Sequence, residues 1–269
     1  MTFTSGGATL VGTLDLPDRA AITGVLIVSG GNEVRAGAHR GMAMLAADLA
    51  AGGLAVFRFD RAGVGDSAGG NAGYAGSRSD ILAAAAALKR ASGIELVVGI
   101  GNCDAASALA LFARECGVDA VIATNPWLGD EPDALPPPAA IRARYREGLV
   151  SSDSWRRLLS GEVSLRKLMA GLAKLLRPAR SRNIAERVLR GISDWGEDAA
   201  VVLAKGDATA LAFAAAARKS PWPFRTYEID TASHGFAGAD ARAALARIVR
   251  QETARLVEIF DRLEENGWA

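Results

Sequence analysis

The stretch Leu96-Val97-Val98-Gly99-Ile100-Gly101-Asn102-Cys103-Asp104-Ala105-Ala106-Ser107 joins an apolar run to an alanine-rich run through a short turn. The pattern predicts a buried strand over 95–100, a tight turn, and a helix over 105–115. A thiol, Cys103, stands at the apex of the turn. The small residues two positions before and after it, Gly101 and Ala105, let strand and helix approach closely, as in a nucleophile elbow.

The rest of the chain repeats this alternation of strands and helices. Short apolar runs predict further strands over 25–28, 55–60, 120–124, 199–204 and 226–229, and helical patterns cover 40–51, 79–91 and 240–263. Alternating strands and helices are typical of a doubly wound, mostly parallel sheet with helices on both faces. We therefore predict an α/β fold in which 1–125 and 195–269 form one core domain.

The alternation breaks after Pro126, where a proline-rich linker leads into a basic helical region. We predict that 126–194 is an inserted helical cap over the site. From Arg142 to Arg190 the chain carries 13 Lys or Arg against four Asp or Glu, a balance of +9 within a net charge of +1. This charge is explained equally by a solvated helix face or by recruitment of an anionic substrate, carrier or lipid surface. Nucleic acid is not an expected partner, because few aromatic residues are interleaved with the basic ones.

Composition indicates an ordinary globular protein that needs neither disulfide nor metal to fold. Of 269 residues, 50% are hydrophobic and 23% are charged, and no apolar run reaches the about 18 residues of a membrane-spanning helix. Cys103 and Cys116 lie roughly 20 Å apart if one helix joins them, too far for a disulfide. We expect a cytoplasmic protein without a metal or organic cofactor; the oligomeric state stays open.

Three residues at the ends of predicted strands have the types required for nucleophilic catalysis. A cysteine is nucleophilic as its thiolate and needs a base or a positive potential nearby. His234 follows the last predicted strand, Asp207 follows the strand before it, and the order nucleophile, acid, histidine suits a doubly wound hydrolase. Asp207 would orient the imidazole and stabilise its protonated form. Asp230 is the alternative acid, and a helix-capping role for Asp207 is the plainer explanation.

Backbone N–H groups near Cys103 would have to stabilise an oxyanion. We expect one donor from Asp104 and a second from Gly31, with Asn32 as the alternative, since Gly30-Gly31-Asn32 directly follows the 25–28 strand. His39 and Arg35 are candidate substrate contacts. His39 equally fits a role in packing at the start of the following helix.

Several motifs make the chain similar to the α/β-hydrolase superfamily over nearly its whole length. The segment Asp60-Arg61-Ala62-Gly63-Val64-Gly65-Asp66-Ser67 resembles the superfamily's Asp-x-x-Gly-x-Gly-x-Ser turn. More narrowly, Gly30-Gly31-Asn32 with Arg35, Gly37, His39 and Arg40, the Arg58-Phe59-Asp60 segment, and Cys103-Asp104-Ala105-Ala106-Ser107 resemble the exosortase A system-associated hydrolase 1 group. That resemblance implies a cysteine in the usual place of serine and a link to bacterial exopolysaccharide production and protein sorting.

Together these features predict a Cys-His-Asp ester or thioester hydrolase, or an acyltransferase, that works through an acyl-enzyme on Cys103. Its substrate would be a small-molecule or carrier-bound acyl group. Two other classes of function stay open. One is a non-catalytic binding or assembly component; the other is a protein that contacts a membrane surface through its basic cap.

Overall fold

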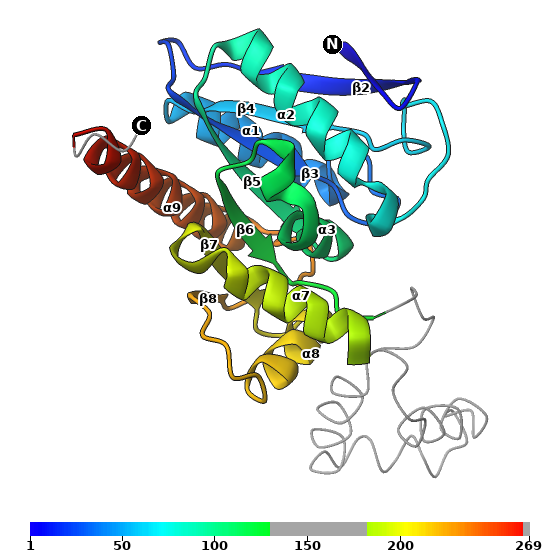
Figure 1. Cartoon of the computed structure of the whole chain (residues 1–269), viewed down its shortest axis with the longest axis vertical. Coiled ribbons are helices and arrows are strands. Elements are labelled where there is room, and N and C mark those ends of the chain that lie inside the picture. Colours follow the sequence, from blue (N-terminus) through cyan, green and yellow to red (C-terminus); the bar gives the residue numbers. More distant parts are fainter. Residues whose placement is uncertain (130–181, 266–269) are drawn as a thin grey trace.

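The computed structural model describes residues 1–129 and 182–265, which contain a single twisted sheet of eight strands (Figure 1). The strand order is β1-β2-β4-β3-β5-β6-β7-β8; β3 to β8 are parallel, and β2 runs antiparallel to both of its neighbours, β1 and β4. Their bounds are β1 Thr2–Ser5, β2 Ala8–Asp15, β3 Thr23–Val28, β4 Ala55–Phe59, β5 Leu96–Asn102, β6 Ala120–Thr124, β7 Ala199–Ala204 and β8 Thr226–Ile229. The predicted doubly wound, mostly parallel sheet is confirmed.

Helices cover both faces of the sheet and divide the core into two layers. The helices are α1 Gly41–Ala51, α2 Arg78–Ser92, α3 Asp104–Phe112, α7 Arg182–Asp194, α8 Ala208–Ala217 and α9 Ala239–Glu265. One layer packs α1 and α9 on the sheet, and the other packs α2, α3, α7 and α8. Successive side chains of β3 point to opposite faces of the sheet. Val25 and Ile27 lie in the layer with α1 and α9, and Leu26 and Val28 lie in the layer with α2, α3, α7 and α8. Burial on both faces explains why the central strands are continuous apolar runs.

The order of the central strands places the site. The chain runs from β3 outward to β4 and then returns across β3 to β5. In doubly wound proteins, ligands bind beyond the carboxyl ends of the strands at such a reversal, which here corresponds to β3 and β5. The loop after β3 holds Gly30-Gly31-Asn32, and the loop after β5 holds Cys103.

The turn after β4 is a rigid structural element built around a buried carboxylate. Asp60 is fully buried and accepts the Asp66 backbone N–H at 3.0 Å, and the Ser67 hydroxyl donates to the Asp60 carbonyl at 2.7 Å. Gly65 has φ +56°, and a Cβ there would lie 2.4 Å from the Asp60 carboxylate, so this position requires glycine. The Asp-x-x-Gly-x-Gly-x-Ser pattern thus encodes a turn that supports the sheet edge.

Most of the predicted insertion, residues 130–181 with ten of the 13 Lys and Arg counted above, lies outside the described residues. Its last part, 182–194, forms α7, whose Ile184, Val188 and Ile192 are buried against the core (Figure 1). The adjoining Trp195 donates its indole N–H to the Ala110 carbonyl of α3 at 3.2 Å. The described end of the predicted insertion thus packs its apolar face on α3.

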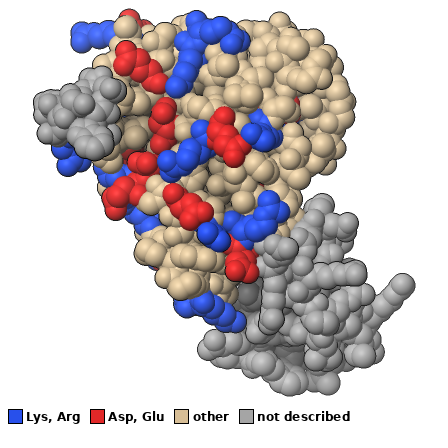
Figure 2. All heavy atoms as spheres, in the orientation of Figure 1, with Lys and Arg blue, Asp and Glu red and all other residues tan. Residues whose placement is uncertain are grey.

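Charges of both signs are intermingled on one face of the molecule. On the face seen in Figure 2, Lys and Arg side chains lie among Asp and Glu side chains, and pairs such as Arg250 with Asp48 and Arg78 with Glu115 are in direct contact. In the described part of the chain no helix is both long and apolar enough to cross a bilayer.

Candidate active site

The turn between β5 and α3 holds Cys103 in a conformation that side chains rarely adopt. Cys103 has φ 60° and ψ −123°, caps the N-terminus of α3 and is partly exposed. Its N–H donates to the Thr124 carbonyl of β6 at 3.1 Å. A Cβ on Gly101 would lie 2.8 Å from the Ala105 backbone, so the close approach of strand and helix requires glycine there. The strained backbone displays the thiol at the carboxyl edge of the sheet.

His234 and Asp207 come together on neighbouring loops beyond β7 and β8. The His234 Nδ1 lies 3.1 Å from the Asp207 Oδ2. The same oxygen accepts the Ala210 N–H at 2.9 Å, so Asp207 also caps α8. The capping role and the histidine contact, which the sequence left as alternatives, are therefore combined in one carboxylate. Asp230, the other acid considered, is exposed.

Cys103 lies close enough to the His234 ring for its side chain to raise the pKa of the imidazole. Because Nδ1 faces Asp207, Nε2 is the nitrogen left for the sulfur. The hydrogen bond to Asp207, followed by the interaction with Cys103, raises the pKa of His234 to about 10, against the opposing effect of burial. Burial alone would raise the pKa of Asp207, but its hydrogen bonds with His234 and Ala210 lower it. The site thus favours a protonated imidazole between two groups that can carry negative charge.

The loop after β3 lies against the elbow, but its expected oxyanion donor already has an acceptor. The Gly31 N–H donates to the Asp104 Oδ1 at 2.6 Å. The Gly31 amide is therefore not free in this conformation. Asn32, the alternative donor, follows in the same loop and receives a hydrogen bond on its side-chain oxygen from Asn71 at 2.7 Å.

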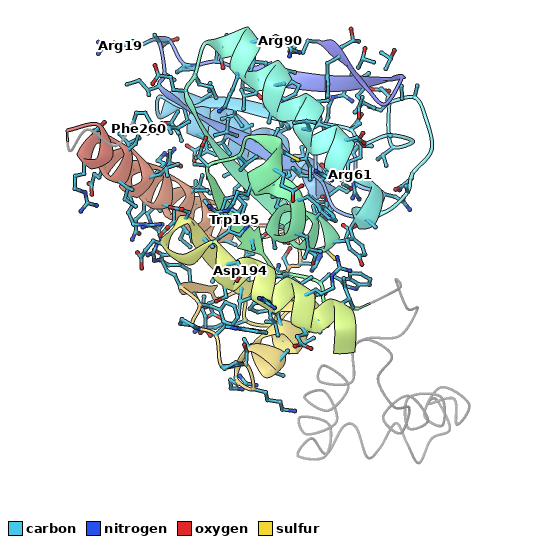
Figure 3. All side chains as sticks on the ribbon, viewed as in Figure 1. Arg19, Arg61, Arg90, Asp194, Trp195 and Phe260 are labelled. Carbon is cyan, nitrogen blue, oxygen red and sulfur yellow. The ribbon has the colours of Figure 1, made fainter. Side chains whose placement is uncertain are left out.

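Arg61, which the sequence analysis did not select as a site residue, connects the loop after β3 to the turn that holds Cys103. Arg61 follows β4 and is almost fully buried (Figure 3). Its guanidinium donates to the Gly31 carbonyl at 2.6 Å, to the Asp104 Oδ2 at 3.2 Å and to the Ser77 hydroxyl at 2.8 Å. Both the N–H and the C=O of Gly31 are thus held by one ion pair. The only sequence signal was an arginine directly after the buried Asp60.

Two candidate substrate contacts have different surroundings. The Arg35 guanidinium binds the carboxylates of Asp60 and Asp66 and the Thr13 hydroxyl, so it holds the β4 turn. A contact between Arg35 and substrate stays a prediction. His39 is exposed and has φ 51°. Its short helical turn abuts the loop of His234, since a Cβ on Gly235 would lie 3.9 Å from the Ala38 Cβ. His39 stays a candidate contact.

Within residues 1–129 and 182–265, no group of three or more His, Cys, Asp and Glu side chains is arranged to hold a metal ion. The thiol of Cys103, the imidazole of His234 and the carboxylate of Asp207 lie on three loops at the carboxyl edge of the sheet. Their arrangement suits transfer of an acyl group to and from sulfur.

Comparison with known proteins identifies the architecture. No protein-family model matches the sequence, and no curated protein matches it. Among solved structures, the chain is similar to a lidless α/β serine hydrolase from Xanthomonas campestris, with a TM-score of 0.60 and 15% identity over 95% of this chain and 93% of that one. The chain has the α/β-hydrolase fold.

Other solved structures with this fold include named enzymes. Est1E from Butyrivibrio proteoclasticus, solved with ferulic acid, gives a TM-score of 0.61 at 15% identity over 96% of this chain and 99% of that one. The thioesterase domain from the curacin biosynthetic pathway gives 0.54 at 15% identity over 93% and 98%. At these sequence identities the similarity shows the α/β-hydrolase fold, whereas the reaction depends on the residues of the site.

Proposed function

We propose that this protein hydrolyses an ester or thioester through an acyl-enzyme on Cys103, with His234 as acid and base and Asp207 as its orienting carboxylate. One observation carries the proposal: the His234 Nδ1 lies 3.1 Å from the Asp207 carboxylate, and the ring is close enough to Cys103 for the thiol to raise its pKa. These residues come from three separate loops at the carboxyl edge of the sheet. That position is where α/β-hydrolase enzymes place their catalytic residues.

The geometry suggests how acylation would proceed. His234 holds the proton of the Cys103 thiol, and the thiolate attacks the substrate carbonyl carbon, forming a carbon–sulfur bond while the carbonyl electron pair moves to oxygen. Collapse of this intermediate breaks the bond to the leaving group, which takes the proton from His234. Asp207 stabilises the imidazolium meanwhile.

Deacylation needs the opposite protonation state of His234. Once Cys103 is acylated, the sulfur carries no charge, and one of the interactions that raise the pKa of His234 is weakened. A neutral His234 can then take a proton from water as the water attacks the thioester carbonyl. Breaking the carbon–sulfur bond releases the acid and restores the thiolate. An alcohol in place of water would give acyl transfer by the same steps.

The nature of the substrate is supported by weaker observations. The named enzymes with this fold include esterases and a thioesterase domain, which favours an acyl substrate. A role beside bacterial exopolysaccharide production rests on the sequence resemblance. An anionic or carrier-bound substrate, or contact with a membrane surface, rests on the +9 balance of residues 142–190.

One observation favours a second candidate, a non-catalytic binding component. A carboxylate, Asp104, occupies the N–H of Gly31 where an oxyanion donor is needed. If Asp104 never leaves, acyl chemistry would lack this donor, which typically contributes a factor of about 10²–10³ in rate. A reactive thiol without turnover would then be expected.

Alkylation of Cys103 by iodoacetamide, followed by intact mass between pH 5 and pH 9.5, tests the proposal without knowledge of the substrate. We expect fast labelling well below the free thiol pKa of about 8.5, slowed in His234→Ala. The buried Cys116, whose pKa burial raises, serves as internal comparison. A p-nitrophenyl ester should then give a Cys103 acyl adduct that decays. Labelling at an ordinary thiol rate, unaffected by His234→Ala, would exclude the catalytic proposal; an adduct that never decays would favour the binding component.

A further inference from the structure

Two asparagines at the ends of neighbouring strands hold the backbone of His234. Asn125, directly after β6, donates its side-chain N–H to the His234 carbonyl at 2.9 Å. Asn102, the last residue of β5, donates to the same carbonyl at 3.2 Å. Two amide donors on one carbonyl fix the position of the residue in a loop that otherwise has no regular structure.

Asn125 also connects the loop of the acid to the loop of the nucleophile. Its Oδ1 accepts the Ala204 N–H at 2.9 Å, at the end of β7 and three residues before Asp207. Its second amide hydrogen reaches the Asn102 Oδ1 at 3.3 Å, next to Cys103. Every donor and acceptor of this side chain therefore contacts the segment of one of the three site residues.

The backbone and burial of Asn125 suit this role. Asn125 is fully buried and has φ 42°, a left-handed conformation that asparagine tolerates better than most residues. A buried polar side chain is stable when all its hydrogen bonds are made. A substitution here would free three segments at once, although the side chain does not touch the thiol.

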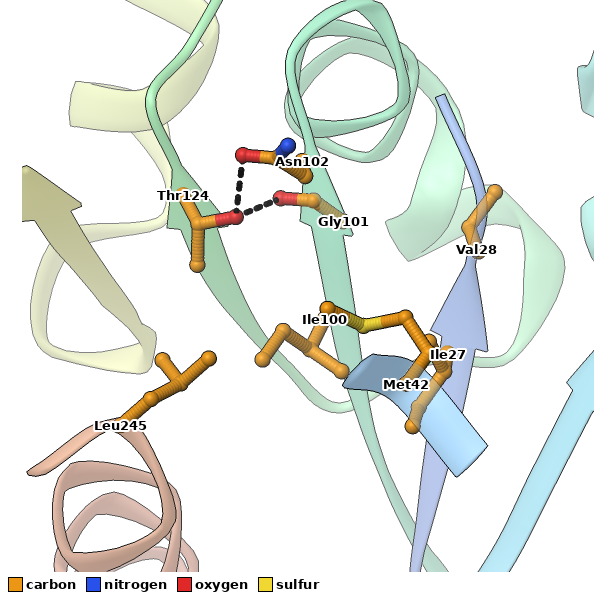
Figure 4. A pocket seen from close by; sticks show the side chains of 8 residues that line it. All are labelled: Ile27, Val28, Met42, Ile100, Gly101, Asn102, Thr124 and Leu245. Atoms are coloured by element: carbon orange, nitrogen blue, oxygen red, sulfur yellow. Dashed lines mark hydrogen bonds between the residues drawn. The ribbon is translucent and has the colours of Figure 1, made fainter. Parts of the chain in front are cut away.

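Thr124 completes the network beneath the elbow. Its hydroxyl donates to the Gly101 carbonyl at 2.9 Å and lies 3.0 Å from the Asn102 Oδ1 (Figure 4). The adjoining cavity has a volume of only about 10 Å³ and is lined mainly by apolar side chains such as Ile100, Met42 and Leu245. This space has room for about one water molecule. The network therefore supports the site from inside and is not itself a substrate pocket.

We propose that Asn125, together with Asn102, is a positioning residue that sets the contact of His234 with both Asp207 and Cys103. The inference rests on the proposed function and adds to it the element that aligns the base. Both asparagines hold the His234 carbonyl, so the part of their effect that passes through the histidine should disappear when His234 is removed.

The test measures alkylation of Cys103 in Asn125→Gly and Asn125→Asp, each with and without His234→Ala. Glycine tolerates the left-handed backbone and removes the donor. Aspartate keeps the acceptor for the Ala204 N–H but loses the donor to His234. We expect both single variants to label at least about tenfold more slowly at pH 6, the effect of about one lost hydrogen bond, and neither to slow labelling further in the His234→Ala background.

A second readout follows His234 itself. The chain has two histidines, so the His234 ring can be titrated by NMR with His39 as internal reference. In Asn125→Gly the pKa of His234 should fall from about 10 toward its ordinary value of about 6.5. Gln251→Glu is a control for the charge that Asn125→Asp adds, because it makes the same change from amide to acid at an exposed position on α9. Its Cys103 should be alkylated at the wild-type rate.

The outcomes separate this inference from the proposed function. Wild-type labelling in either folded Asn125 variant, or equal slowing with and without His234, overturns the positioning role. If His234→Ala leaves labelling unchanged, the proposed function fails, and the His234 titration in Asn125→Gly still decides whether Asn125 holds the histidine.

Discussion

The carboxylate of Asp104, the residue that follows Cys103, accepts the backbone N–H of Gly31 at 2.6 Å. The residue after the proposed nucleophile thereby places a negative charge on the expected oxyanion donor. The same carboxylate forms an ion pair with the buried Arg61. For acyl chemistry to use Gly31, Asp104 must release this N–H and keep Arg61 as its partner.

Replacing Asp104 should therefore change rate and stability in opposite directions. Asp104→Ser is too short to reach Gly31, and we expect it to acylate Cys103 with p-nitrophenyl acetate at least about tenfold faster, because the donor is freed. It should also lower the free energy of unfolding by about 2 kcal/mol, since Arg61 loses its counter-ion. Stopped-flow release of p-nitrophenol and urea unfolding measure the two effects. A slower burst would show that the carboxylate is needed where it lies.

Arg61 should be important for stability despite its charge. Its guanidinium makes three hydrogen bonds from an almost fully buried position, and the point charge of lysine cannot reproduce this fork. We expect Arg61→Lys to lower the free energy of unfolding by about 2–3 kcal/mol in urea. Arg19→Lys, at an exposed position (Figure 3), should have almost no effect. Equal stability of the two variants would contradict the loop-clamping role of Arg61.

The sequence was sufficient to predict the central sheet and the approximate place of the site. Central strands such as β5 and β7 are buried on both faces and form apolar runs, and Cys103 and Asp207 closely follow them. His234 follows the edge strand β8, which is only partly buried. The hairpin of β1 and β2 was missed because these strands alternate between buried and exposed residues and lie at the sheet edge. Gly6-Gly7 between them is a hairpin signal that could have indicated it.

The contacts around the site could not be predicted from the sequence. Arg61 and Asp104 are distant along the chain, and charged residues are usually exposed, so neither suggested a buried ion pair. The same holds for Arg35, whose place in the motif suggested a substrate contact, while the fold directs it to Asp60. Asn125 was equally inconspicuous, because its role depends on three loops that meet only in the folded chain.

The raised pKa of His234 predicts how stability depends on pH. Because the folded-state pKa, about 10, exceeds the unfolded value of about 6.5, the protonated imidazole stabilises the fold fully below about pH 6.5. This contribution is lost as the pH rises toward 10. Thermal unfolding should therefore show His234→Gln less stable than the wild type at pH 6, with the difference disappearing by about pH 10. A difference that does not change with pH would exclude a charged His234 between Asp207 and Cys103.

The backbone conformation of Cys103 predicts that a non-glycine residue at this position destabilises the fold. Its φ of 60° and ψ of −123° lie in a region that glycine adopts readily and other residues adopt at a cost of about 1–3 kcal/mol. Cys103→Gly should therefore be more stable than Cys103→Ala by about 1 kcal/mol in urea unfolding. Ala105→Gly, two residues later inside α3, should instead destabilise by a similar amount, because glycine weakens helix interiors. If glycine lowered the free energy of unfolding at both position 103 and position 105, the backbone of Cys103 would not be strained. The surrounding strand and helix would then not need to stabilise the conformation that exposes the thiol.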